Sequence, residues 1–476
     1  MCIVTGLAIL FSSCEDFLTV TPHDSLASEN ALETIDDYNN LVLDPYSSLR
    51  SASYLSEFMM IVPEAMSDNL IINTSGRTTY NEFFDFQFSS GTFGTAGFWS
   101  AGYNAIMSAN NVIANLETAN PFEGTADEAR SKNILAEALA IRGLIHFDLV
   151  KFYGKSYRSA NDSDLGVPYK FTPTIDMPSR DPLKEVYEYI IADLEKSRSI
   201  IEDTYNASDN FRLNKKSIAA ILSRIYLTMG NYAKASEYAT LAITGNGSDI
   251  CKLADYTKMW TTSMKISEVL FRVAVLQTDT QIPGNTYGQG DANSHKAEYV
   301  VSHSFLREFD ADTDIRATQI QRVVSDGKQY NAVWKHHGRT GESTGKVDIA
   351  VIRASEVYLT RAEANYYLGR EAEALNDLNL LRKQRYLEFQ DGTEVGAVLL
   401  NAIMKERRLE LAFEGHRFFD IKRTNADIQR DNYGDQADGS GVPANTLFIP
   451  ATSPYYLLTI PQSEINANKN MVQNNY

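Results

Sequence analysis

Three glutamates near the end of the chain have the spacing of a carboxylate-based catalytic site. A helix would place Glu406, Glu410 and Glu414 one turn apart on one face. Two carboxylates that flank a glycosidic bond can act as general acid and nucleophile. The same block also contains four basic side chains, Arg407, Arg408, Arg417 and Arg423. Interleaved opposite charges are typical of ion pairs that stabilise a helix, and we predict this structural role for the block.

Two other motifs resemble functional loops but lack required residues. The run from Gly341 to Lys346 has three residues between its glycines where a phosphate loop has four, and Val347 replaces the magnesium-binding hydroxyl. A calcium-loop pattern, Asp310, Asp312 and Asp314, is followed by isoleucine and glutamine at the glycine and bidentate carboxylate positions. We predict no metal, no cofactor and no enzymatic activity.

Sugar binding requires different residues: flat aromatic faces that cover the C–H side of a pyranose, and polar groups that fix its hydroxyls. Residues 81–103 contain eight aromatic side chains in 23 positions, and polar side chains stand just upstream. From this region we predict ligand contacts by Asp68, Asn73, Arg77, Tyr80 and Trp99.

Several of these aromatic residues also fit a packing role. Phe84, Phe86 and Phe88 alternate with polar residues, which predicts one buried face of a strand. Trp99 shares helical spacing with Tyr103 and Ile106, which favours a core position.

A second region combines rings and hydrogen-bonding groups in a glycine-rich context. Here we predict ligand contacts by Asn285, Tyr287, His295 and Trp334, with Tyr299 and Tyr330 in the same stretch. For each of these residues taken singly, packing remains the alternative.

Composition excludes several classes of protein. The chain has 476 residues, 43% of them hydrophobic, which is typical of a folded globular protein. Its 44 basic and 61 acidic side chains give a net charge of −17, which disfavours nucleic acid as a partner. No run of eighteen uninterrupted apolar residues occurs, so we predict no membrane-spanning helix.

The first residues resemble a bacterial lipoprotein signal. An apolar run ends in Ser12-Ser13-Cys14, and acidic residues follow at once. In such lipoproteins a peptidase cleaves before the cysteine, which is then acylated. We therefore predict a signal peptide over residues 1–13, lipidation at Cys14 and a tether over 14–28, with a buried N-terminal strand as the alternative. Cys251 is then expected to be a small buried residue, without a disulfide partner.

Two distant segments resemble each other when aligned on a glycine. A small residue precedes Gly230 and Gly369 by seven positions, and an alanine follows each by five. Small side chains there allow two antiparallel helices to approach around a tight turn, as in a tetratricopeptide-type hairpin. An ordinary helical hairpin is the alternative. Apolar residues at helical spacing also predict helices over 132–153 and 182–202.

Five segments carry a resemblance to one family over essentially the whole chain. They are CEDFLTVTP, LAEALAIRGLIHFDLVKFYG, DIAVIRASEVYLTRAEANYYLG, KERRLELAFEGHRFFDIKR and IPQSEINANKNMVQNNY. Together they resemble the SusD/RagB family of nutrient-binding lipoproteins of Bacteroidota.

The resemblance implies a mainly α fold, in which tetratricopeptide-type hairpins form a scaffold and a largely irregular face with a few short strands binds ligand. For a domain over 29–476 we expect the scaffold over about 29–60, 104–245 and 350–425. The binding face is then expected over about 61–103, 246–349 and 426–476.

The resemblance also implies a function and a partner. It predicts a non-catalytic lipoprotein on the outer membrane, facing outward, that passes oligosaccharide to a SusC-like TonB-dependent transporter. A peptide-binding, RagB-like protein is the first alternative, and a surface glycosidase is a distant second.

Overall fold

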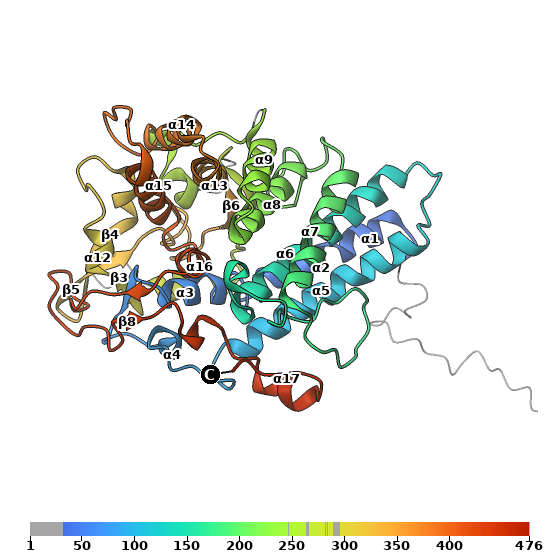
Figure 1. Ribbon diagram of the computed structural model, residues 1–476, viewed down its shortest axis with the longest axis horizontal. Helices are drawn as coiled ribbons and strands as arrows, with labels where there is room; N and C mark the ends of the chain where they lie inside the picture. The colour runs from blue at the N-terminus through green and yellow to red at the C-terminus, as the bar shows by residue number, and fades with distance from the viewer. Residues whose placement is uncertain are drawn as a thin grey trace, which may run out of the picture.

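The computed structural model describes residues 32–245, 247–262, 266–280, 282, 284–288 and 296–475 (Figure 1). Two predicted functional residues, Cys14 and His295, lie outside them. The described part is mainly helical, as predicted. Its α-helices are α1 (Ile35–Leu41), α2 (Leu43–Leu49), α3 (Phe58–Ala65), α4 (Asn81–Phe84), α5 (Thr95–Thr118), α6 (Glu128–Tyr153), α7 (Leu183–Ile200), α8 (Lys215–Met229), α9 (Tyr232–Ile243), α10 (Lys258–Thr261), α11 (Gly284–Tyr287), α12 (His303–Leu306), α13 (Ala354–Tyr367), α14 (Glu371–Arg382), α15 (Gly396–Leu411), α16 (Arg417–Arg423) and α17 (Gln462–Ala467).

The long helices pack side by side in an order that does not follow the whole sequence. α2 packs on α5, and the row continues through α6, α7, α8 and α9. α9 then packs on α13, which contacts α14 and α15. Figure 1 shows this row, with α1 and α5 at one end and α14 and α15 at the other. The scaffold is therefore assembled from segments separated by about a quarter of the chain.

Helix α6 lies in the middle of one half of this row. The five apolar residues that predict the helix are all completely buried, and they are Ala138, Ile141, Ile145, Leu149 and Phe152. Most of the remaining side chains between Ile134 and Val150 are buried too, because α5 covers one side of α6 and α7 the other. Gly154 follows the last helical residue, as the sequence predicts.

Both predicted hairpins are present. Gly230 ends α8 with φ 78° and Gly369 follows α13 with φ 74°, a left-handed conformation that glycine adopts without steric cost. The small residues at the predicted positions are buried between the helices, and they are Ser223, Ala235, Ala362 and Ala374. The side chains of Ser236 and Asn365 then hydrogen-bond at 2.8 Å, which joins the second helix of one hairpin to the first helix of the other.

Outside the row of helices, the chain forms short antiparallel sheets. The strands are β1 (Leu70–Ile72), β2 (Val269–Val273), β3 (Tyr299–Val301), β4 (Ile320–Ser325), β5 (Lys328–Val333), β6 (Ile349–Arg353), β7 (Ile428–Gln429) and β8 (Phe448–Ile449). One sheet has the order β1-β3-β5-β4, and β2–β6 and β7–β8 form two pairs. Leu70 lies opposite Val301, so residues 231 positions apart meet in one sheet.

The strand predicted for Phe84, Phe86 and Phe88 is wrong. Phe84 ends the short helix α4, and Phe86 has a left-handed φ of 56° in the turn that follows. All three rings are buried nonetheless. The residues alternate in polarity because the chain makes a tight turn here. The three rings point into one core, and the polar side chains between them are less buried.

Candidate functional site

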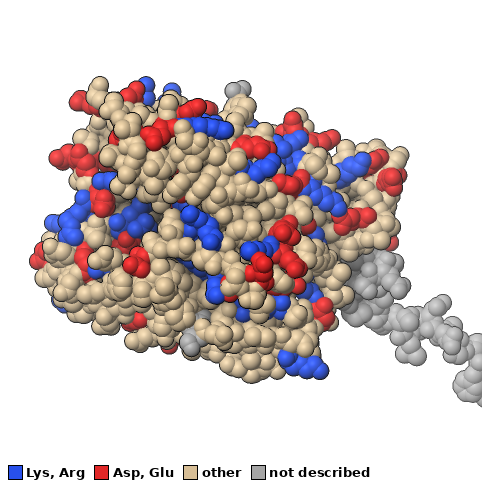
Figure 2. Space-filling view, viewed as in Figure 1, with Lys and Arg blue, Asp and Glu red and all other residues tan. Residues whose placement is uncertain are grey.

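An open cavity of about 490 Å³ lies beside α4, in the region that the sequence singles out. It is bounded on one side by residues 78–82 and on the other by residues 89 and 91–93. Aromatic, amide, carboxylate and hydroxyl groups all line it. In Figure 2, the lower part of this face, where α4 lies in Figure 1, carries few charged side chains.

Tyr80 forms one wall of the cavity and is held from behind by the core. It has a left-handed φ of 62° immediately before α4, and its ring packs edge-on against Phe58 at 5.8 Å between centroids. Gly94 leaves room for the Tyr80 ring, because a Cβ at residue 94 would lie 2.8 Å from Tyr80 Cε1 and 2.9 Å from Phe58 Cε2. The ring is thus fixed in place before any ligand arrives.

Phe93 supplies an exposed aromatic face next to Tyr80. Its side chain is 70% exposed, whereas phenylalanine side chains are usually buried. The two ring centroids lie 5.6 Å apart and the ring planes are tilted by 33°. Two adjacent, tilted rings of this kind form a concave apolar surface that fits the C–H side of a saccharide.

Polar groups surround the two rings. The side chains of Asn81 and Glu82 are exposed, and hydroxyl groups come from Thr78, Thr79, Ser89 and Thr92. Within the described part of the chain, the Tyr80 hydroxyl has no hydrogen-bond partner. Burial raises the pKa of Tyr80 above its usual range, so this hydroxyl stays protonated and can both donate and accept.

Arg77 lies just outside the cavity and has one fixed partner. Its Nη2 lies 2.8 Å from Glu298 Oε1, while 69% of the side chain is exposed. The other oxygen of Glu298 accepts the backbone N–H of Thr79 at 2.9 Å. One buried carboxylate therefore orients both the arginine and the first edge of the cavity.

Asp68 and Asn73, also predicted as ligand contacts, lie inside the protein. Arg417 donates to both oxygens of Asp68 at 2.7 and 2.8 Å, and Arg408 lies 3.1 Å away. Burial alone would raise the pKa of Asp68, but the two arginines lower it to about 2. Asn73 donates its amide to the Ala297 carbonyl at 2.9 Å. Both side chains hold the backbone that leads to Arg77, and neither lines the cavity.

Trp99 is buried and lines a different, smaller cavity of about 250 Å³ together with Tyr103 and Met471. Its ring packs against Tyr153 at 4.9 Å and Tyr103 at 4.8 Å. The helix predicted from the spacing of Trp99 and Tyr103 is present as α5.

None of the described residues of the second predicted region lines the cavity beside α4. Tyr287 is 1% exposed, and its hydroxyl donates to the Met60 carbonyl. Trp334 is partly buried and stacks on His337 at 3.6 Å. Asn285 donates to the Thr280 carbonyl. These contacts are packing contacts, the alternative that the sequence also allows.

Of the residues that line the cavity, sequence reasoning identified only Tyr80 and missed Phe93, Asn81, Glu82 and the hydroxyl residues around them. Phe93 stands alone between two glycines in Gly91-Thr92-Phe93-Gly94, without a large apolar neighbour at strand or helix spacing. That isolation is the signal that could have distinguished it from the core phenylalanines around it.

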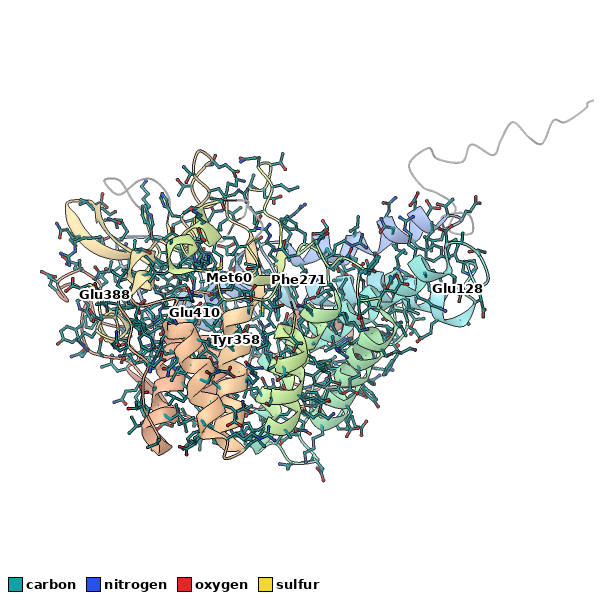
Figure 3. The ribbon with its side chains drawn as sticks, turned by 90° about the horizontal axis from the view of Figure 1, so that it is seen from above. Met60, Glu128, Phe271, Tyr358, Glu388 and Glu410 are labelled. Atoms are coloured by element: carbon teal, nitrogen blue, oxygen red, sulfur yellow. The ribbon has the colours of Figure 1, made fainter. Side chains whose placement is uncertain are left out.

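The glutamates with catalytic spacing are used in a buried ion network. Glu410 lies at the inner end of α15 (Figure 3) and accepts from Arg353 at 2.7 Å and Arg385 at 2.8 Å. Arg353 also reaches Glu414 at 2.5 Å, and Arg316 reaches Glu406 at 2.7 Å. The glutamates form ion pairs, as predicted, but the predicted pairing with the arginines of their own helix is wrong, because their partners come from β6, α14 and neighbouring loops. The helix's own arginines bind other carboxylates, such as Asp420 for Arg407.

The described residues contain neither a helix suited to span a membrane nor a cluster of metal ligands. None of the helices there is long and apolar enough to cross a membrane. No group of three or more His, Cys, Asp and Glu side chains in the same residues has the arrangement of a metal site.

Comparison with known proteins gives matches along the whole chain. A family model described as the SusD family matches residues 223–476, and one described as starch-binding associating with outer membrane matches residues 16–227. SusD-like protein P2 of Formosa agariphila is 27% identical, over 99% of this chain and 98% of that protein.

Solved structures share the fold. A SusD superfamily protein of Bacteroides thetaiotaomicron superposes with a TM-score of 0.84 and 26% identity, covering 93% of this chain and 100% of the other. A putative sugar binding protein of Bacteroides vulgatus gives a TM-score of 0.80 and 26% identity, covering 93% and 99%. With the helical hairpins, the short sheets and these matches in agreement, the chain belongs to the SusD family, a family of non-catalytic binding proteins.

Proposed function

We propose that this protein is a lipid-anchored lipoprotein of the outer membrane that captures oligosaccharide outside the cell and passes it to a SusC-like TonB-dependent transporter. The cavity beside α4 is the proposed capture site. Acylation at Cys14 supplies the anchor, and the stacked helices hold the site in a fixed geometry.

One observation carries the proposal: the exposed ring of Phe93 lies beside the fixed ring of Tyr80, surrounded by neutral polar groups and one carboxylate. Apolar ring faces bury the C–H surface of a sugar, while amide, carboxylate and hydroxyl groups replace water around its hydroxyls. The cavity is open, so a chain longer than one sugar can extend beyond it.

The chemistry of the cavity favours saccharide over peptide. A peptide-binding groove usually offers a strand edge or a helix-sized apolar trough. Residues 78–82 instead form a turn and the start of α4, and their backbone is bonded within the protein. The name of the Bacteroides vulgatus protein, putative sugar binding protein, agrees with this preference.

Ring truncation tests the site. In calorimetric titration of a Cys14→Ala protein with the glycan selected from an array of glycans and peptides, Phe93→Ala should lower affinity about ten- to thirty-fold, because one stacked ring contributes about 1–2 kcal/mol. The melting temperature should hardly change. Phe171→Ala, which truncates a half-exposed ring elsewhere, is the matched control and should leave affinity unchanged.

Selection of peptides alone on the array would replace the saccharide proposal by the peptide one. Equal losses in the Phe93 and Phe171 variants would exclude the cavity as the site. The transporter partner is tested by mild-detergent pull-down from outer membranes, which should recover a TonB-dependent barrel. Repeated recovery of the lipoprotein alone would contradict delivery to such a partner.

A further inference from the structure

A cavity of about 850 Å³ is separate from the site beside α4. It lies between the loop that follows α6, helix α16 and two C-terminal segments, residues 451–457 and 472–475. Its volume falls within the range of about 300–1,000 Å³ that is usual for small-molecule sites. Nothing in the proposed capture of neutral sugar uses it.

The charge of this cavity is opposite to that of the protein. Lys155, Arg180 and Lys422 line it, and Asp164 is the only acidic side chain among its lining residues. The whole chain, in contrast, carries a net charge of −17. Three cations around one enclosed space attract an anion that the rest of the surface repels.

Lys422 and Arg180 are the buried cations of the cavity, each 6% exposed. Arg180 donates to carbonyls of the protein, among them those of Tyr153 and Gly166. The Nζ of Lys422 donates to the carbonyls of Lys151 at 2.7 Å and Gly154 at 2.8 Å, which closes the C-terminal end of α6. These bonds use two of its three protons. Among the described residues, no carboxylate lies within ion-pair distance of this ammonium. Burial lowers the pKa of Lys422 to about 7, and a bound anion would stabilise its charged form.

The rim of the cavity carries one ion pair, formed by Lys155 and Asp164. Lys155 is half exposed, and its Nζ lies 2.5 Å from Asp164 Oδ1. Asp164 is committed to the loop as well, since its Oδ2 accepts the backbone N–H of Asn161 at 2.9 Å. Lys155 thus adds a second ammonium group to the cavity lining, and the only carboxylate among the lining residues is already paired.

Neutral hydrogen-bonding groups fill most of the remaining lining. The Ser156 hydroxyl is buried and has no partner within the described residues, which is costly unless a ligand or water satisfies it. Further hydroxyl and amide groups come from Ser159, Ser163, Asn425, Thr452 and Ser453. A bare inorganic ion would leave most of these groups unused, whereas a polyhydroxylated ligand would bind them.

Segments next to the two cavities contact each other. Tyr455 packs edge-on against Phe88 at 5.5 Å, and Ser90 and Gln462 form hydrogen bonds at 2.8 and 2.9 Å. Figure 1 shows the C-terminal end of the chain between α4 and α17. The turn that carries Ser89 and Gly91 of the capture site therefore touches the segment that carries Pro454 and Tyr456 of the second cavity.

We propose that this cavity is a second ligand site that takes an acidic saccharide, a sugar bearing a carboxylate, with the carboxylate at Lys422 and Lys155 and the sugar hydroxyls on the serine and amide groups. The proposal deepens the proposed function and rests on saccharide being the cargo. An acidic unit would be held here while a neutral part of the same chain lies on Phe93.

The test uses D-galacturonate as probe, with D-galactose and acetate as matched compounds, and ligand-observed NMR on the Cys14→Ala protein. Galacturonate should bind at least tenfold more tightly than either. Lys422→Met should lower the affinity for galacturonate by at least tenfold. Because Lys422 also caps α6, a second variant, Lys155→Ala, is used that is expected to fold normally, and it should lower this affinity about three- to tenfold. Lys196→Ala, which truncates a surface lysine paired with Glu117, should leave the affinity unchanged.

Equal affinity for galacturonate and galactose would overturn the proposal, and so would equal affinity for acetate and galacturonate. Unchanged galacturonate affinity in the Lys155 variant would do the same. Phe93→Ala should leave galacturonate binding intact. If the protein binds galacturonate but no neutral glycan, the proposed capture site is wrong while the second site is supported.

Discussion

Arg353 and Glu410 form an ion pair of 2.7 Å in the protein interior, where both side chains are almost completely buried. Arg353 comes from β6 and Glu410 from α15, so the pair joins the irregular part of the molecule to the helical row. Although burial opposes ionisation of Glu410, Arg385 and Arg353 hold its pKa well below the usual range.

Glu410→Gln should therefore be strongly destabilising. It removes the charge that compensates two buried guanidinium groups, and breaking a buried ion pair costs about 3–5 kcal/mol. Urea unfolding followed by circular dichroism measures this loss. Glu373→Gln, an exposed glutamate on α14, should change the free energy of unfolding by less than about 0.5 kcal/mol. Similar small losses in both variants would show that the network contributes little.

Gly94→Ala should damage the capture site from behind. The added Cβ would lie against the rings of Tyr80 and Phe58, and φ is +95° at this position. We expect a loss of about 1–3 kcal/mol in stability and about tenfold lower glycan affinity, because Tyr80 must move. Gly91→Ala is the control on the same cavity, since its Cβ would meet no atom within 4 Å. Normal binding by the Gly94 variant would remove Tyr80 from the site.

Stability should fall as the pH is lowered from 6.5 toward 3, partly because of His146. This buried ring donates from Nδ1 to the Arg142 carbonyl and accepts the Lys170 N–H at Nε2, so a second proton would break the latter bond. Burial lowers the pKa of His146 to about 3. Between pH 3 and 6.5 the unfolded chain binds the extra proton, and folding loses free energy as pH falls.

Urea unfolding at pH 7.5 and pH 5 checks this expectation. His146 should account for about 2 kcal/mol of the difference between the two pH values in the wild type. His146→Gln should be less stable at pH 7.5 and show a smaller difference. An identical pH dependence in both proteins would exclude His146 as a source of acid sensitivity.

Cys14→Ala should release the protein from the membrane, because the proposed anchor is a lipid on that residue. Cell fractionation and the mass of the N-terminal peptide measure this outcome. A Cys14→Ala protein that stays in the membrane fraction, together with a wild-type peptide without added acyl mass, would contradict lipidation.

The helices were predictable because their signals are local. Gly230 and Gly369 mark turns, and the small residues around them follow from helix spacing alone. The sheets were less predictable, since the pairing of Leu70 with Val301 depends on contacts between residues far apart in sequence. The ion network shows the same limit, because the spacing of the glutamates reveals a helix face while the partners come from other elements.

The candidate site was found by composition, and its individual residues were only partly identified. Tyr80 lines the cavity and Arg77 lies beside it, but Tyr287 has the same residue type and is buried behind α3. Residue type cannot distinguish a ring that contacts ligand from one that fills the core. Phe93 differs from its neighbours only in being surrounded by small residues, and its exposure follows from the path of the turn.

The direct packing of α9 on α13 means that residues 244–353 form an insertion between two adjacent repeats. The stacking of Tyr232 on Tyr367, with centroids 4.3 Å apart, holds the two helices together at their other end, beside the hairpin turns. Lengthening a closed loop costs little free energy, since the entropic penalty grows only logarithmically with its length. Loops of the insertion can therefore lengthen without disturbing the repeat array, provided that Arg316 and Arg353 still reach Glu406 and Glu410.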